Sequence, residues 1–359
     1  MGRSRSELMS EAQRSLEERL RARISEGGPI SYEELIDVVL YDEEQGYYRR
    51  GKQEGVDYYT SPEVHPAFGR TIGRYLERVA ELVRTDRFSI LELGGGTGRL
   101  ARDIISSIDT HRLTRYLILE KGRRISDDGV EWIETPGQLP ALNGLTFVIA
   151  NEFFDALAFH KIIMKDGNIR EIYVGCNHGF FEVPGPLTAD AASFLSLLPL
   201  YLDEGQVCEV TTKTPAIIRD ITKALDQSVF LIFDYGYHGD DLAWGRFANG
   251  SAVGYRDMVM RADILTSMGG MDITHHVNFD HLSALLQGQG WKKVAEVPQY
   301  RFLFLAGIID ALEGLGQEER LRAKMLIDPH GLGSTLNVLA FTKDVAIELP
   351  GFKKSRTAP

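Results

Sequence analysis

Three acidic residues lie in or directly after apolar runs that are typical of buried parallel strands. Glu92 lies in the run 88–93, Glu120 follows the run 116–119, and Glu152 follows the run 145–150. Because ligands of open α/β sheets bind at the carboxyl ends of parallel strands, we expect these carboxylates at one edge of a sheet. Carboxylates at that edge favour a cationic ligand or a cationic substrate.

A glycine cluster follows Glu92 and narrows the choice of ligand. Gly94, Gly96 and Gly98 are spaced two residues apart. A dinucleotide-binding loop has a different glycine spacing, and its last glycine would fall where this chain has Arg99 and Leu100. The loop also lacks the lysine of a P-loop, and Glu92 would repel a pyrophosphate. S-adenosylmethionine carries an ammonium and a sulfonium, and Glu92 with these glycines resembles the first motif of class I methyltransferases. Glu120 would then accept the ribose hydroxyls.

The surrounding segments predict an α/β fold that positions these residues. Helical periodicity predicts helices over 6–25, from Ser31 onward and over 67–83, and continuous apolar runs predict buried strands over 88–93, 145–150 and 229–234. Alternation over 161–183 around Asp166-Gly167 predicts an antiparallel insertion. Residues 236–278 are expected to form a long loop, and 294–306 and 336–342 have the character of strands.

Composition limits the class of protein and of partner. The chain has 359 residues, 43% of them hydrophobic, and a formal net charge of −11, which argues against nucleic acid as a partner. The two cysteines, Cys176 and Cys208, cannot form a disulfide framework, and no cysteine and histidine cluster has metal-site spacing. No apolar run approaches the about 18 residues that span a bilayer, and residues 1–23 do not have the pattern of a targeting signal. We therefore expect a cytoplasmic protein without membrane insertion or a metal.

Taken together, six ordered stretches resemble the MidA-type family of S-adenosylmethionine-dependent methyltransferases. They are residues 40–48, residues 59–69, the glycine loop, residues 151–157, residues 233–236 and residues 272–279. The resemblance implies a class I methyltransferase (Rossmann-like) fold with a mostly parallel sheet, an N-terminal helical region and a β-hairpin insertion. Mitochondrial members of the family assist assembly of respiratory complex I by methylating an arginine of a core subunit, so the resemblance implies a protein substrate and arginine methylation.

The chain departs from the family pattern at three places. Lys121-Gly122-Arg123 replaces the usual residues after the second-strand acid, Ala158 replaces a proline, and Met258 stands where the family has a histidine. These changes put the substrate in doubt more than the cofactor.

The expected site has a cofactor side and a substrate side. Arginine is protonated at neutral pH, so carboxylates are needed to orient its guanidinium and to stabilise the developing cation. The expected catalytic residues are Glu152, Asp155 and Asn151; the expected cofactor-binding residues are Glu92, Gly94, Gly96, Gly98, Glu120, Tyr59 and Glu63; and the expected substrate contacts are Asp234, Tyr235 and His275. Tyr47 is expected over the same cleft as Tyr59 and Glu63.

Two other functions and the oligomeric state stay open at this point. A small-molecule methyltransferase would use the same cofactor loop, and a scaffold could keep that loop without catalysis. The expected domains are an N-terminal helical region with a cofactor-covering loop over 1–85, a methyltransferase core over 86–345 with an insertion around 160–205, and a disordered tail over 346–359. A homodimer is one option for the assembly.

Overall fold

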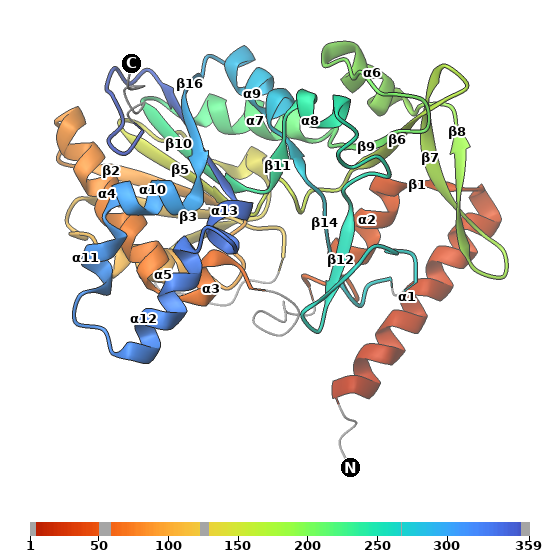
Figure 1. Ribbon diagram of the computed structural model, residues 1–359, viewed down its shortest axis with the longest axis horizontal. Helices are drawn as coiled ribbons and strands as arrows, with labels where there is room; N and C mark the ends of the chain where they lie inside the picture. The colour runs from red at the N-terminus through yellow and green to blue at the C-terminus, as the bar shows by residue number, and fades with distance from the viewer. Residues whose placement is uncertain (1–4, 50–58, 123–128, 267, 353–359) are drawn as a thin grey trace. The chain divides into compact units, whose positions relative to one another are not determined.

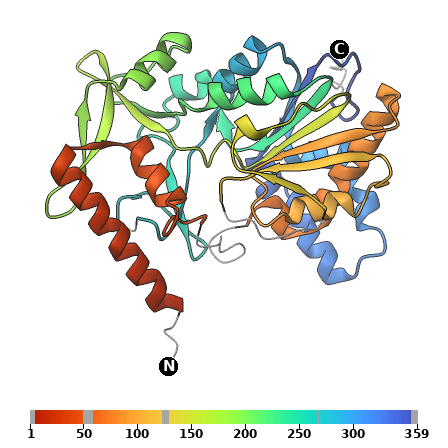
Figure 2. The same ribbon diagram turned by 180° about the vertical axis from the view of Figure 1, so that it is seen from behind.

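The computed structural model describes residues 5–49, 59–122, 129–266 and 268–352 (Figures 1 and 2). The chain divides into two compact units: the first contains 1–58, 155–215 and 237–281, and the second contains 59–154, 216–236 and 282–359. This division differs from the boundaries expected from the sequence. Residues 59–83 belong with the large sheet, whereas 155–215 belong with the N-terminal helices. Most of the expected tail, 353–359, lies outside the described residues.

A seven-stranded mixed sheet forms the centre of the second unit. Its order is β16-β17-β10-β5-β2-β3-β4, in which β10, β5, β2, β3 and β4 are mutually parallel and β17 is antiparallel to both its neighbours. The strands are β2 (Phe88–Leu93), β3 (Leu113–Leu119), β4 (Glu131–Ile133), β5 (Thr146–Asn151), β10 (Ser228–Asp234), β16 (Lys292–Pro298) and β17 (Asn337–Lys343). The parallel core agrees with the expected α/β fold, because the predicted strands 88–93, 145–150 and 229–234 all lie in it.

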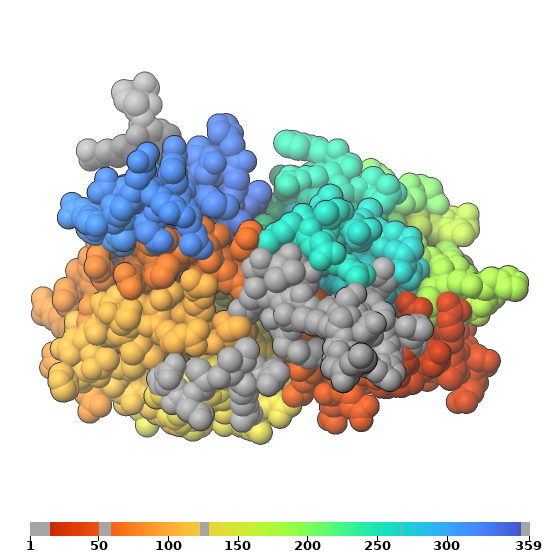
Figure 3. Space-filling view, turned by 90° about the horizontal axis from the view of Figure 1, so that it is seen from below, coloured from red at the N-terminus to blue at the C-terminus, as the bar shows by residue number. Residues whose placement is uncertain are grey.

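Helices cover both faces of this sheet. One face packs against α4 (Ala67–Val83), α5 (Arg99–Ile105) and α10 (Gln299–Ala306), and its core includes Phe68, Tyr75 and Phe302. The helix α11 (Ile308–Leu312) contacts α4, and Figure 3 shows segments near the C-terminus (blue) beside segments of the orange part of the chain on the surface of this unit. On the other face Phe230 contacts Trp291, whose Nε1 donates to Thr222 of α7 (Thr214–Ala224) at 2.8 Å. The remaining elements are α3 (Ser61–Val64), the 3₁₀ turn η1 (Pro136–Gln138), α9 (Phe279–Gly288), α12 (Gln317–Lys324), the 3₁₀ turn η2 (Met325–Ile327) and α13 (Leu332–Thr335).

The first unit is built on a five-stranded antiparallel sheet. Its order is β1-β7-β6-β9, with β8 paired to β7, and Asp166-Gly167 form the turn between β6 and β7. The elements of this part are α1 (Arg5–Gly27), β1 (Ile30–Ser31), α2 (Tyr32–Tyr41), β6 (His160–Lys165), β7 (Asn168–Cys176), β8 (Phe180–Gly185), α6 (Ala189–Leu197) and β9 (Val207–Val210).

No described helix, not even α1 with its 23 residues, is long and apolar enough to cross a membrane.

Two predictions of local structure are wrong. Residues 236–278 are not one long loop, because they contain β11 (Gly236–Tyr237), α8 (Gly239–Ala243), β12 (Val253–Arg256), β13 (Val259–Arg261), β14 (Asp272–Thr274) and β15 (Val277–Asn278). The turn between β12 and β13 places Asp257 and Met258 at positive φ values of 52° and 61°, so Met258 lies at a hairpin tip. Residues 299–306 form α10, not a strand, because Pro298 ends β16 and is a suitable residue before a helix.

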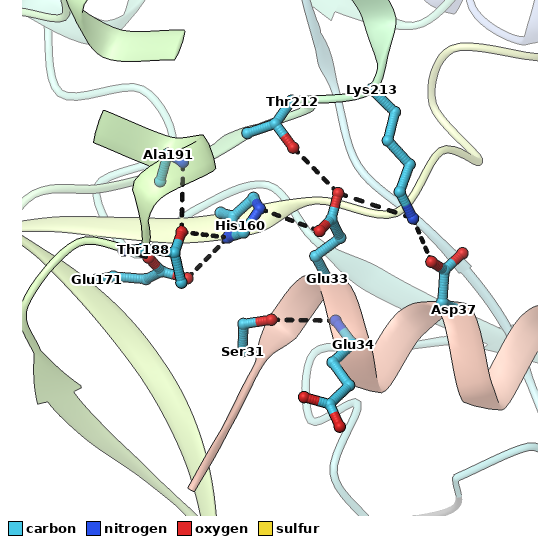
Figure 4. Close-up of polar contacts among 10 residues, drawn as sticks. All are labelled: Ser31, Glu33, Glu34, Asp37, His160, Glu171, Thr188, Ala191, Thr212 and Lys213. Atoms are coloured by element: carbon cyan, nitrogen blue, oxygen red, sulfur yellow. Dashed lines mark hydrogen bonds and ion pairs between the residues drawn. The ribbon is translucent and has the colours of Figure 1, made fainter. Parts of the chain in front are cut away.

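A buried histidine holds three elements of the first unit together (Figure 4). His160 of β6 has its Nδ1 2.7 Å from Glu171 Oε1 of β7 and its Nε2 3.2 Å from Glu33 Oε2 of α2. The side chain of His160 is 2% exposed. Burial alone would lower the pKa of His160, but the two carboxylates outweigh it and raise the pKa to about 9. His160 is therefore charged at neutral pH.

The two carboxylates around His160 have further donors. Thr188 N donates to Glu171 Oε2 at 2.7 Å, and Thr212 Oγ1 donates to Glu33 Oε1 at 3.0 Å. Lys213 Nζ lies 3.7 Å from Glu33 Oε1. This network joins α2 to the sheet and to the start of α6, and no pattern in the sequence predicted it.

We expect the first unit to lose stability in alkaline solution through His160. The pKa of His160 is raised from about 6.5 to about 9, so its contribution is complete below about pH 6.5 and disappears as the pH rises through about 9. The shift corresponds to at most about 3 kcal/mol. Urea unfolding of the wild type and of His160→Gln, measured from pH 6 to pH 9.5, tests this.

The matched control is His178→Gln, which changes an exposed histidine of the same unit. It should follow the wild-type curve. Parallel curves for the wild type and His160→Gln over the whole range would contradict the charged state of His160.

Candidate cofactor and substrate site

The turn between β2 and α5 has the backbone conformation that its glycines predict. Gly94, Gly96 and Gly98 have φ values of +74°, +51° and +71°, a region that side chains with a Cβ rarely adopt. Gly95 is required for another reason: a Cβ there would lie 2.3 Å from Ile118 Cγ2 on β3. This packing role of Gly95 was not predicted from the sequence. The turn is thus shaped for close approach of a ligand to its backbone.

Two carboxylates lie at this turn. Glu120 Oε2 accepts the Gly96 N–H at 2.9 Å, and its Oε1 accepts the Gly122 N–H at 2.5 Å. Glu92 is 2% exposed, and its Oε2 accepts the Tyr116 hydroxyl at 2.6 Å. Burial is the largest cause that raises the pKa of Glu92, the negative charge of Glu120 adds to it and the hydrogen bond from Tyr116 opposes it, and together they bring the pKa to about 7. Glu92 therefore titrates near neutrality, and a cation bound nearby would favour its ionised form.

The end of β5 carries the expected catalytic residues of this unit. Glu152 has a φ of +51°, which is rare for a residue other than glycine, and its N–H donates to Phe233 O of β10 at 2.8 Å. Asn151 Nδ2 donates to Glu152 Oε1 at 3.2 Å, and the Ser61 N–H lies 3.4 Å from the same oxygen. The carboxylate of Glu152 is thus held from two sides.

The expected substrate residue Asp234 has both carboxylate oxygens on backbone groups. Its Oδ2 accepts the Phe154 N–H at 3.0 Å, its Oδ1 accepts the Tyr235 N–H at 2.9 Å, and the residue is fully buried. Asp234 therefore joins the end of β10 to the turn that follows β5. This arrangement favours a structural role for Asp234 beside the predicted contact with substrate.

The segment before α4 contains two residues that we expect near the cofactor. Glu63 is buried, and its Oε2 accepts the Thr60 N–H at 3.2 Å as part of the capping of α3. Tyr59 is 45% exposed. Tyr47 belongs to the first unit, where its ring lies edge-on to Tyr48 at 5.4 Å. The expectation that these three side chains cover one cleft stays a prediction.

Asp155 and His275 lie together in the first unit, whereas Tyr235 belongs to the second. Asp155 O accepts the His275 N–H at 3.0 Å, and both residues are buried. His275 Nδ1 donates to His276 O at 3.1 Å, and the His275 ring lies edge-on to Phe159 at 5.1 Å.

The same unit contains a tyrosine and carboxylate pair that was not singled out from the sequence. Tyr48 donates its hydroxyl to Asp272 Oδ1 at 2.5 Å, and Asp272 is 1% exposed. Burial raises the pKa of Tyr48 well above its usual value, and the charge of Asp272 adds to the shift. The only sequence signal was that both residues lie in stretches that carry the family resemblance.

The sequence of this chain is similar to those of known methyltransferases. A family profile described as "Putative S-adenosyl-L-methionine-dependent methyltransferase" matches residues 71–297. The chain belongs to this family. Human mitochondrial protein arginine methyltransferase NDUFAF7 is 26% identical over 377 residues, covering 89% of this chain and 82% of that protein. The Drosophila melanogaster homolog is 25% identical and covers 91% and 84% of the two chains.

A solved structure has the same fold. The protein from Burkholderia thailandensis, bound to S-adenosyl-homocysteine, is 22% identical, and the match covers 100% of both chains with a TM-score of 0.83. The family match confirms the MidA-type resemblance, and with it the S-adenosylmethionine cofactor. The residues of the second unit fit this cofactor, because the glycines at positive φ place no side chain between the turn and a ligand, and Glu92 is a buried carboxylate at this turn that a cation would favour.

We expect Gly96→Val to abolish cofactor binding. A β-branched side chain is strained at a φ of +51°, and it would also block close approach of the ligand to the turn. Gly137→Val is the matched control, since a Cβ at Gly137 meets no atom within 4 Å. Calorimetric titration with S-adenosyl-homocysteine measures both variants. Native affinity in Gly96→Val would show that the cofactor binds elsewhere.

Proposed function

We propose that this methyltransferase modifies an arginine side chain of a protein, and that Glu152 is the catalytic residue that orients the guanidinium. The observation that carries the proposal is the backbone of Glu152, which has a φ of +51° at the carboxyl end of a parallel strand. Strained residues of this kind persist where the surrounding structure fixes them, and they concentrate at functional sites. The NDUFAF7 proteins, named as protein arginine methyltransferases, support the choice of arginine at 26% identity.

In this reaction the protein mainly has to orient the guanidinium and to stabilise its positive charge. When bound, S-adenosylmethionine supplies an electrophilic methyl group on its sulfonium. The Glu152 carboxylate accepts hydrogen bonds from the guanidinium, orients one nitrogen and stabilises the positive charge. Transfer would release S-adenosyl-homocysteine and one N–H proton of the guanidinium, so that the methylated product keeps a single positive charge. Asn151 Oδ1 is a second acceptor, because it has no hydrogen-bond partner among the described residues. Asp155 stays a predicted catalytic residue, and Asp234, Tyr235 and His275 stay predicted substrate contacts.

One experiment separates this function from its two rivals. The purified protein is incubated with methyl-labelled S-adenosylmethionine and a cell lysate, and protein is then separated from small molecules and hydrolysed to amino acids. We expect label in methylarginine. Label in the small-molecule fraction would favour a small-molecule methyltransferase. Cofactor binding without any transfer would favour a non-catalytic assembly factor.

We expect Glu152→Gln to slow transfer by roughly ten- to a hundredfold. The substitution keeps the shape of the side chain but removes a charge-assisted hydrogen bond to a cation, which typically contributes about 1.5–3 kcal/mol. Cofactor affinity should barely change. The rate of labelled methylarginine formation tests this, with the surface variant Glu131→Gln as the control, since Glu131 pairs with Arg115 on β3. Transfer at the native rate would exclude Glu152 from the reaction.

We also expect cofactor affinity to weaken as the pH falls below about 7. The pKa of Glu92 is about 7 without ligand, and a bound ammonium or sulfonium would lower it, so binding at about pH 6 must release a proton. Calorimetry in two buffers of different ionisation enthalpy measures this release. The variant Glu92→Gln should bind more weakly and without that pH dependence. Identical pH dependence in the variant would contradict the predicted role of Glu92.

A further inference from the structure

We infer that Gln299 is a positioning residue for Glu152 and acts through Ser61. The inference rests on the proposed function, in which Glu152 orients the substrate. Gln299 is separated from Glu152 by more than a hundred residues along the chain, yet a short series of hydrogen bonds connects them within the second unit. The first two links are buried, and the third, at Glu152, is partly buried.

The first link fixes the amide of Gln299. Gln299 is fully buried at the start of α10, and its backbone N–H donates to Leu336 O at 2.9 Å. Its Nε2 donates to Leu326 O of η2 at 3.2 Å. A carbonyl can only accept, so this contact fixes which end of the side-chain amide carries the oxygen. The Gln299 Oε1 is therefore presented in one orientation.

The second link passes from Gln299 to α3. Ser61 Oγ donates to Gln299 Oε1 at 3.0 Å, and Ser61 is fully buried. The helix α3 has only four residues and lies beside η2, so it has few hydrogen bonds of its own to fix its position. Gln299 ties Ser61 to η2 and to the start of α10. Among its contacts, which also include α4 and α5, α3 is thus held at Ser61 by a direct hydrogen bond to the helices inserted between β16 and β17.

The third link passes from the Ser61 backbone to the carboxylate. The Ser61 N–H lies 3.4 Å from Glu152 Oε1, the oxygen that also accepts Asn151 Nδ2 at 3.2 Å. A contact of 3.4 Å is near the limit of a hydrogen bond, so its strength depends steeply on where Ser61 is held. A small displacement of Ser61 would therefore release the carboxylate on that side. Gln299 sets this distance without touching the substrate.

The test uses two single variants, Gln299→Met and Ser61→Ala, and repeats Gln299→Met in a protein that already carries Glu152→Gln. Gln299→Met keeps the length of the side chain but removes its amide, and Ser61→Ala removes the hydroxyl but keeps the N–H that reaches Glu152. We expect each to lower the rate of labelled methylarginine formation in lysate proteins, at saturating S-adenosylmethionine, by about three- to tenfold. Their combination should be no worse than either alone, because both break the same link.

The background variant distinguishes positioning from a loss of stability. In Glu152→Gln, adding Gln299→Met should change the rate by less than twofold, while the affinity for S-adenosyl-homocysteine stays native throughout. Thr222→Val is the control, since it removes a buried hydrogen bond to Trp291 in the same unit. Thr222→Val should lower the urea concentration at the midpoint of unfolding about as much as Gln299→Met does, but it should not slow methyl transfer.

The failures of the two proposals can be told apart. If Glu152→Gln transfers at the native rate, the proposed function fails. If Glu152→Gln is slow but Gln299→Met is as fast as the wild type, or slows both backgrounds equally, the positioning role of Gln299 is overturned.

Discussion

The geometry of the candidate site depends on how the ends of β5 and β10 are joined. The buried carboxylate of Asp234 accepts N–H groups from Phe154 and Tyr235, and the Glu152 N–H donates to Phe233. These bonds close the turn after β5 against the neighbouring parallel strand. They also stabilise a positive φ at Glu152 that would otherwise cost about 1 kcal/mol or more.

The two carboxylates at the glycine turn differ because their surroundings differ. Glu92 is nearly inaccessible and accepts the neutral hydroxyl of Tyr116, and its burial raises its pKa to about 7. Glu120 instead accepts two backbone N–H groups of the turn itself. The two carboxylates therefore have different roles. Glu120 helps to shape the loop, whereas Glu92 is a group whose ionisation a cationic ligand would favour.

The interior of the first unit combines an apolar core with paired charges. His160 lies between Glu33 and Glu171, whereas the sheet of the second unit packs aromatic side chains such as Phe68, Phe233 and Phe302 edge-on. A buried charge pair requires accurate geometry, because removal of either partner leaves the other uncompensated. The His160 network therefore fixes how α2 meets β6 and β7, at the expense of a dependence on pH.

The sequence by itself determined the strongly periodic elements and the cofactor turn. Residues 67–83 and 88–93 have the periods of a helix and a buried strand, and alternate glycines specify positive φ, because these properties depend only on nearby residues. Only the tertiary structure decided which polar groups meet. The partners Asp234 with Phe154, Gln299 with Ser61 and His160 with Glu33 are far apart in the chain. No local period encodes such a pairing, since it arises only when the packed sheets and helices bring separate segments together.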